Sequence, residues 1–180
     1  MAETVNVKNV GLRGVTVADT KVSFIDGEKG VLIYRGYRIE ELAQSSSFME
    51  VAYLLLNGSL PDKKQLVAFT KQVTEARELP QHIYECFKKW PKDSNPMDVL
   101  QATVPMLAMV DPDLQDETRD ANFRMATRLI ARLPVVVAAW HRIRNGLEPL
   151  SSDDSLLHAA NFLWLLHGKK PDEEMAHDLD

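Results

Sequence analysis

The spacing of apolar residues divides the chain into a short β-like beginning and a long helical remainder. Two short segments rich in β-branched and aromatic residues, 21–25 and 31–34, flank a loop that contains Gly27 and Gly30. Glycine supplies the positive φ angles that such a loop needs, so the pattern predicts a small hairpin. From residue 39 onward, apolar residues recur three and four positions apart, as on one face of a helix. We therefore expect a mainly α, multi-helical fold with a small N-terminal β-hairpin.

Capping signals set the expected helix ends. Ser47 and Glu50 have the S-x-x-E spacing of a capping box, and Gly58 offers a left-handed C-terminal conformation. Helices are expected from 47 to 57, from 62 to 79, between Pro80 and Pro91, from Pro96 through Leu107, from 121 to 145 as one kinked helix or two around Pro134, from Ser151 or Ser152 to His167, and from Pro171 onward. The acidic stretch 111–120 is expected to be an exposed loop and is a candidate domain boundary.

Charge and cysteine content narrow the class of protein. The 180 residues carry a net charge of −5, which opposes general binding to nucleic acid or to an anionic membrane. The single cysteine, Cys86, cannot form an intramolecular disulfide and is expected in the core. The longest apolar runs fall far short of the ~20 residues needed to span a bilayer. We expect a cytoplasmic protein with neither nucleic acid nor membrane as a partner.

The residues present do not assemble a catalytic motif. No glycine-rich phosphate loop, C-x-x-C, H-E-x-x-H or G-x-S-x-G occurs. On one helix His158 and His167 would lie roughly 180° apart, so they would not share a metal or a substrate. The candidates for acid–base chemistry are the five histidines, His82, His141, His158, His167 and His177. No metal site is expected.

Three other features have competing interpretations. Arg128 and Arg132 lie four positions apart and could clamp a phosphate, but ion-paired or solvated arginines are the favoured interpretation. His141 lies near a helix C-terminus, where the helix dipole favours cations. The acidic pairs 153–154 and 173–174 fit the first turns of helices better than a catalytic dyad.

Nine stretches in order carry a resemblance to a known family. The longest, GVLIYRGYRIEELA, covers 30–43. The stretches are 11–15, 23–27, 30–43, 50–58, 60–61, 95–98, 133–134, 138–140 and 160–168. Together they resemble the N-terminal part of bacterial citrate synthases across essentially the whole chain.

The resemblance implies a mostly helical homodimer whose subunits have a large and a small domain. It also implies a reaction that joins acetyl-CoA and oxaloacetate to give citrate and CoA in the tricarboxylic acid cycle. In this family an aspartate removes a proton from the acetyl methyl group, a histidine stabilises the enol, and a second histidine donates to oxaloacetate. The chain would be the N-terminal half of the large domain, with a hairpin segment over 1–38 and a helical part over 39–180.

The family segments that carry this chemistry, H-A-x-H, G-P-x-H-G and G-x-G-H-R, do not occur in the sequence and are expected after Asp180. We therefore assign no catalytic residue and no metal ligand, leave the cofactor-binding residues open, and expect the chain to be inactive alone. Acetyl-CoA would be a substrate of the full enzyme, and no cofactor is expected on this chain. The alternatives are a 2-methylcitrate synthase using propionyl-CoA and a non-catalytic helical dimerisation module. The run 162–166 is expected to form an exposed apolar patch.

Overall fold

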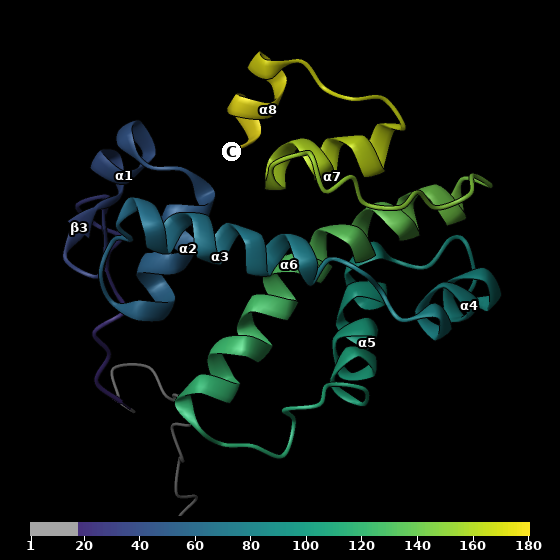
Figure 1. Ribbon diagram of the computed structural model, residues 1–180, viewed down its shortest axis with the longest axis horizontal. Helices are drawn as coiled ribbons and strands as arrows, with labels where there is room; N and C mark the ends of the chain where they lie inside the picture. The colour runs from purple at the N-terminus through teal and green to yellow at the C-terminus, as the bar shows by residue number, and fades with distance from the viewer. Residues whose placement is uncertain (1–17) are drawn as a thin grey trace, which may run out of the picture.

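A small antiparallel sheet precedes eight helices in the computed structural model, which describes residues 18–180 (Figure 1). In chain order the elements are β1 Ser23–Asp26, β2 Val31–Tyr34, β3 Tyr37–Arg38, α1 Ile39–Ser45, α2 Phe48–Asn57, α3 Lys63–Glu75, α4 Gln81–Lys89, α5 Pro96–Ala108, α6 Arg119–Arg144, α7 His158–His167 and α8 Glu173–Leu179. The mainly helical fold predicted from the spacing is confirmed.

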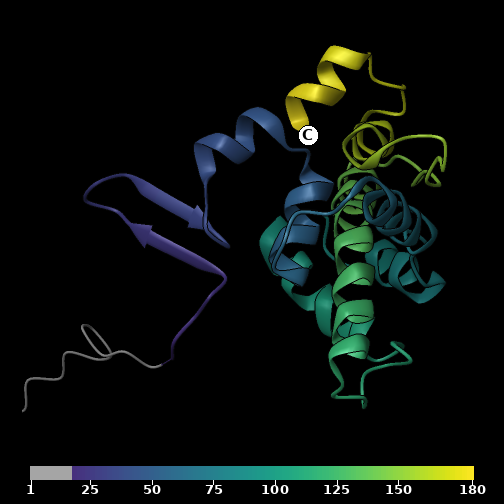
Figure 2. The ribbon, with the colours of Figure 1, turned by 60° about the vertical axis from the view of Figure 1, so that its left-hand side comes forward.

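The sheet has the order β1-β2-β3 and is antiparallel throughout. Phe24 of β1 pairs with Ile33 of β2, so the predicted hairpin is confirmed. A third strand of two residues extends the sheet after Gly36, whose φ of 97° provides the reversal. In Figure 2 the two long strands extend away from the helices, and Phe24 and Ile25 are exposed.

The helix ends near α2 follow the local signals, whereas the end of α3 does not. Ser47 and Glu50 form the expected capping box, in which the Ser47 N–H donates to Glu50 Oε2 at 2.8 Å. The prediction that the next helix reaches residue 79 is wrong, because α3 ends at Glu75. Arg132 Nε of α6 donates to the carbonyl oxygens of Ala76 at 3.3 Å and Glu78 at 3.1 Å. These long-range bonds hold the backbone beyond α3 away from helical geometry.

The helix α6 is the element around which the others pack. It is a single helix through Pro134, the first of the two alternatives, and it bends near its middle in Figure 1. One buried cluster joins α6 to α4, α5 and α7, and a second joins it to α2 and α3. The most deeply buried large side chains in these clusters are Phe69, Val73, Ile83, Phe87, Val136 and Leu165. Both clusters share α6, which makes this helix the common wall of the core.

Ile83 and Phe87 occupy the buried face of α4. The thiol of Cys86 is half-buried rather than in the core, because Cys86 lies at the edge of that face. The expectation of a core cysteine is therefore corrected.

The segment before α7 is irregular, which corrects the prediction that a helix begins at Ser151 or Ser152. The helix begins only at His158, and the acidic pair 153–154 therefore does not lie in its first turn. The side chain of Asn161 accepts a hydrogen bond from the Asp153 N–H at 2.9 Å, and its amide donates to Ser152 Oγ at 3.4 Å. These bonds satisfy the backbone in a turn, so a helix is not needed there.

Candidate functional site

The five histidines lie on four helices, and the structure does not bring them together. His82 is on α4, His141 on α6 and His177 on α8, while His158 and His167 are the first and last residues of α7. Among residues 18–180, no three side chains of His, Cys, Asp or Glu are grouped so that they could hold a metal ion. These histidines therefore form no common site.

The ring of His158 at the start of α7 is half-buried. Burial, and after it the positive charge of Arg77, lowers the pKa of His158 to about 4, although Asp180 acts in the opposite direction. The ring stacks on Phe48, with centroids 5.0 Å apart and planes 4° from parallel. A neutral imidazole in contact with an aromatic ring is a packing group first and an acid–base candidate second.

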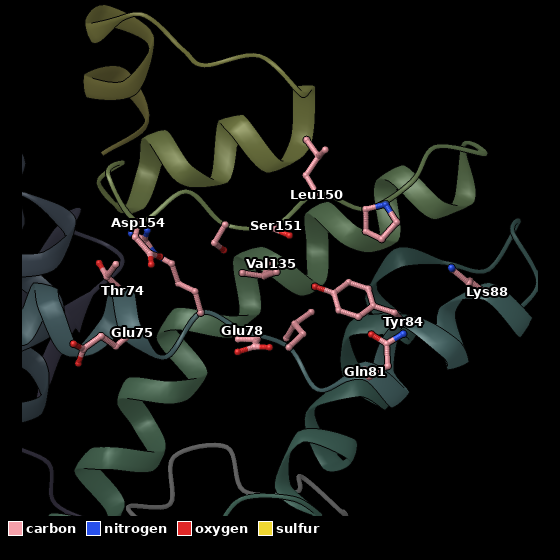
Figure 3. Close-up of a pocket in the computed structure, with 14 residues that line it drawn as sticks. Thr74, Glu75, Glu78, Gln81, Tyr84, Lys88, Val135, Leu150, Ser151 and Asp154 are labelled. Atoms are coloured by element: carbon pink, nitrogen blue, oxygen red, sulfur yellow. The ribbon is translucent and has the colours of Figure 1, made fainter.

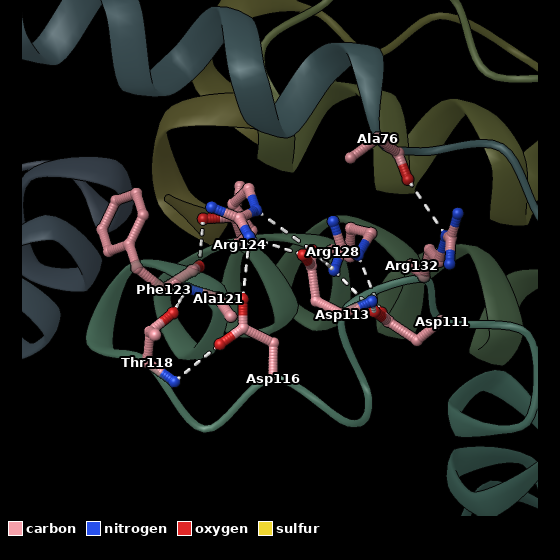
Figure 4. Close-up of polar contacts among 11 residues, drawn as sticks. Ala76, Asp111, Asp113, Asp116, Thr118, Ala121, Phe123, Arg124, Arg128 and Arg132 are labelled. Carbon is pink, nitrogen blue, oxygen red and sulfur yellow. Dashed lines mark hydrogen bonds and ion pairs between the residues drawn. The ribbon is translucent and has the colours of Figure 1, made fainter.

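The two arginines considered as a phosphate clamp already have protein acceptors (Figure 4). Arg128 Nε and Nη2 donate to the two carboxylate oxygens of Asp111 at 2.7 and 2.6 Å, and Nη2 also contacts Asp113. Arg132 Nε is bonded to backbone carbonyls after α3. Hydrogen bonds from Arg124, and next from Arg128, hold the pKa of Asp113 well below its usual range. The arrangement is a network of ion pairs that fastens the loop 109–118 to α6, not a site for phosphate.

A cleft of about 480 Å³ lies between the end of α3, α4, α6 and the residues after Leu147 (Figure 3). Its polar lining mixes both signs of charge, with Glu75, Glu78 and Asp154 facing the same space as Lys88. Burial, and then the charge of Glu78, raises the pKa of the Tyr84 hydroxyl. A cleft of mixed charge, with a tyrosine that stays protonated, selects neither a simple anion nor a simple cation.

Arg77 lies at one end of this cleft and was not identified from the sequence. It is 2% exposed, and its Nη1 donates to the carbonyl oxygens of Asp153 at 3.3 Å and Leu156 at 3.0 Å. Its Nε is buried with no partner among the described residues, and burial lowers the pKa of its guanidinium. The only sequence signal for it is its place between a helix end and Pro80. Its contacts make it a clamp on the segment that leads into α7.

A second, apolar hollow of about 300 Å³ runs between α6 and α7. Its lining residues are Phe48, Leu133, Pro134, Val137, His158, Ala159, Phe162 and Leu179. The expected apolar patch over 162–166 is only partly present, because Leu163 and Leu165 are buried and the other three residues are half-buried. Leu165 joins the main core cluster, and Phe162, Trp164 and Leu166 pack partly buried against it.

The described residues thus form a helical scaffold around one long helix, with these two clefts and with histidines that lie apart on four helices. The chain matches a family model described as "Citrate synthase, C-terminal domain" over residues 11–180. It is 41% identical to the citrate synthase of Haloferax volcanii over 174 residues, which is 94% of this chain and 46% of that protein. It is 33% identical to the 2-methylcitrate synthase of Shewanella oneidensis, over 95% of this chain and 45% of that protein.

The solved structures agree with these relatives. The citrate synthase of Pyrobaculum aerophilum superposes with a TM-score of 0.86 and 36% identity, over 98% of this chain and 49% of that one. The chain belongs to the citrate synthase family. It spans about half the length of the relatives and solved structures it matches.

No described helix is long and apolar enough to cross a membrane.

Proposed function

We propose that this chain provides the scaffold part of a citrate synthase, which condenses acetyl-CoA with oxaloacetate and water to give citrate and CoA. The observation that carries the proposal is the TM-score of 0.86 to a citrate synthase at 36% identity over 98% of the chain. At this identity and coverage, the common fold is supported by common sequence as well. In this proposal the reaction belongs to the tricarboxylic acid cycle.

The proposed division of labour follows from what the chain lacks. General acid–base catalysis of this condensation needs a base at the acetyl methyl group and donors at the developing enolate and at the oxaloacetate carbonyl. The family segments that carry these roles are absent from the sequence. In the described part, the histidines are scattered over four helices. We therefore propose that the chain alone is inactive, that it binds no cofactor, and that its helices hold groups supplied by the other half.

The partners proposed are oxaloacetate, acetyl-CoA and a second subunit. Large apolar side chains at the outer face of α5 and in the loop after it are strongly exposed, with Met97 at 66% and Met109 at 74%. Val110 and Leu114 in the same loop are exposed as well. Exposed large apolar side chains that a second subunit could cover support the proposed dimer. A single half-buried cysteine supports a cytoplasmic location for the dimer.

The acyl substrate of the proposed reaction has one alternative to acetyl-CoA. A Bacillus subtilis relative at 34% identity is named citrate/2-methylcitrate synthase, and the Shewanella oneidensis relative is named 2-methylcitrate synthase. The alternative is therefore condensation of propionyl-CoA. Acetyl-CoA is preferred because the relatives at 41% identity are named citrate synthase.

The test is a reconstitution assay. The 180-residue chain is assayed for CoA release from acetyl-CoA plus oxaloacetate, alone and mixed with a separately expressed segment of the Synechocystis relative that follows the matched region. We expect no release by either piece alone and release by the mixture. Propionyl-CoA in place of acetyl-CoA then separates the two acyl alternatives by the ratio of their kcat/KM values.

A matched pair of variants shows whether recovery depends on the folded chain. Leu165 is 2% exposed and Leu157 is 70% exposed, and both belong to the α7 region. Leu165→Asp should abolish the recovered activity, because it buries an unpaired charge. Leu157→Asp should keep it, because Leu157 is the N-cap position, where aspartate is favoured. CoA release by the chain alone would contradict the proposal, and an inactive mixture would favour a non-catalytic module.

A further inference from the structure

The apolar hollow between α6 and α7 contains one titratable side chain among its described lining residues, His158. Its other walls are aliphatic or aromatic, and α6 contributes Leu133, Pro134 and Val137. The imidazole lies flat against Phe48 of α2 at 5.0 Å. Leu179 of α8 completes the lining. The ring thus lies where α2, α6, α7 and α8 meet.

The helix α8 is weakly held at this junction. None of its residues is buried, and Leu179 is 47% exposed. The Phe48 N–H donates to Asp180 Oδ2 at 3.3 Å, which ties the end of α8 to the start of α2. Few buried apolar contacts mean a low free energy of local opening.

A charge on His158 would be unfavourable in this position. The hollow is apolar, the first turn of α7 presents the positive end of a helix dipole, and the positive charge of Arg77 acts on the ring. Asp180 is the one carboxylate that opposes these effects. The other carboxylate near the start of α2, Glu50, is engaged in the capping box with Ser47.

We propose that His158 is a pH-sensitive latch for α8: the neutral ring completes the apolar junction that holds the helix, and the protonated ring releases it from α2 and α7. Opening transfers the imidazole to water, where its pKa has the ordinary value of ~6.5, against about 4 in the closed state. The open state therefore binds the proton more strongly. Between these two values the ratio of closed to open molecules falls by up to about tenfold for each pH unit lost.

The first experiment records NMR spectra of the 180-residue chain from pH 7 to pH 4. The amide signals of α8 and the imidazole signal of His158 should change with a common midpoint below pH 6, while the amides of α5 stay constant. In His158→Phe the α8 signals should stay at their pH 7 positions, because a phenyl ring fills the junction without titrating. His177→Gln, which removes the exposed histidine of α8 itself, should titrate like the wild type. Asp180→Asn tests whether the Asp180 carboxylate, rather than the imidazole, triggers release.

The second experiment needs no acid. His158→Arg carries a permanent charge, so at pH 7 its α8 amides should have the shifts of an unstructured chain while the α5 amides remain native. The latch is contradicted if His158→Arg keeps α8 in the wild-type position. It is also contradicted if α8 of His158→Phe titrates like the wild type, or if Asp180→Asn abolishes the transition. The proposal is independent of the reaction assigned to the full enzyme.

Discussion

The loop 109–118 and the segment 151–157 are both irregular, and arginines fasten them in opposite ways. In the loop, the carboxylates of Asp111 and Asp113 reach Arg124 and Arg128 on α6. In the segment, backbone carbonyl oxygens reach Arg77, which is buried. Acid and salt weaken the ion pairs of carboxylates, whereas a backbone carbonyl neither titrates nor carries a net charge that salt could screen. The same guanidinium group therefore gives the loop 109–118 a tunable attachment, which depends on pH and salt, and gives the segment 151–157 a fixed one.

The largest expected effect comes from removing the fixed attachment. Arg77→Met should lower the free energy of unfolding by about 3 kcal/mol, because two part-buried carbonyl groups lose the buried guanidinium that donates to them. Arg119→Met, at an exposed position in the first turn of α6, should change it by less than about 0.5 kcal/mol. Urea unfolding followed by circular dichroism measures both. A loss below about 1 kcal/mol for Arg77→Met would remove the distinction between the two attachments.

The tunable attachment should contribute less and should depend on salt. Arg128→Met should cost about 1–2 kcal/mol at low ionic strength, because its ion pairs with Asp111 and Asp113 are partly buried. In 1 M salt the cost should shrink, since the Debye length falls to about 3 Å. The cost of Arg77→Met should stay constant in the same series. An equal salt dependence for the two variants would contradict this account.

Acid should weaken the attachment of the loop 109–118 and leave the Arg77 attachment of the segment 151–157 unchanged. Arg124 and Arg128 hold the pKa of Asp113 below its unfolded value, so the stabilisation from Asp113 is present above pH ~4 and is lost as the pH falls through the lower folded value. The difference in unfolding free energy between wild type and Asp113→Asn should therefore be constant from pH 7 to pH 5 and should decline below about pH 4. A difference that grows on acidification would have the wrong sign. Chemical denaturation at each pH provides the measurement.

The smallest effect on stability is expected for an exposed salt bridge to the segment 151–157. Lys170 Nζ lies 2.6 Å from Asp153 Oδ2, but its side chain is 57% exposed. Lys170→Met should therefore change the unfolding free energy by less than about 1 kcal/mol. Hydrogen bonds from Lys170, and then from Ser155, lower the pKa of Asp153 to about 2. NMR titration should find that this pKa rises in Lys170→Met while the segment keeps its backbone shifts.

Local signals were sufficient for the parts of the fold that local bonds stabilise. The capping box at Ser47 and Glu50 and the left-handed Gly58 involve neighbours within a few residues, and both are present as predicted. The hairpin is also a local structure. The end of α3 and the start of α7 were misplaced because distant side chains decide them. Arg132 bonds the chain after α3, and Asn161 bonds the turn before α7.

The candidate site shows the same limit. No local pattern distinguishes Arg77 from the exposed arginines of the chain. Its burial depends on a segment more than 70 positions away in sequence. His158 is a second example, because the Phe48 ring that stacks on it belongs to a segment far away in the sequence. Residues whose environment is built by distant segments need the structure.

The central claim is that these residues supply scaffold and no catalytic group. The most direct test replaces all five histidines at once, with His158→Phe and Gln at the other positions, and repeats the reconstitution assay. We predict kcat and KM within about twofold of the mixture containing the wild-type chain. Loss of a general acid or base typically costs 10²–10⁴-fold in rate. A fall of that size in kcat, with the variant still folded, would contradict the claim and place catalysis on this chain.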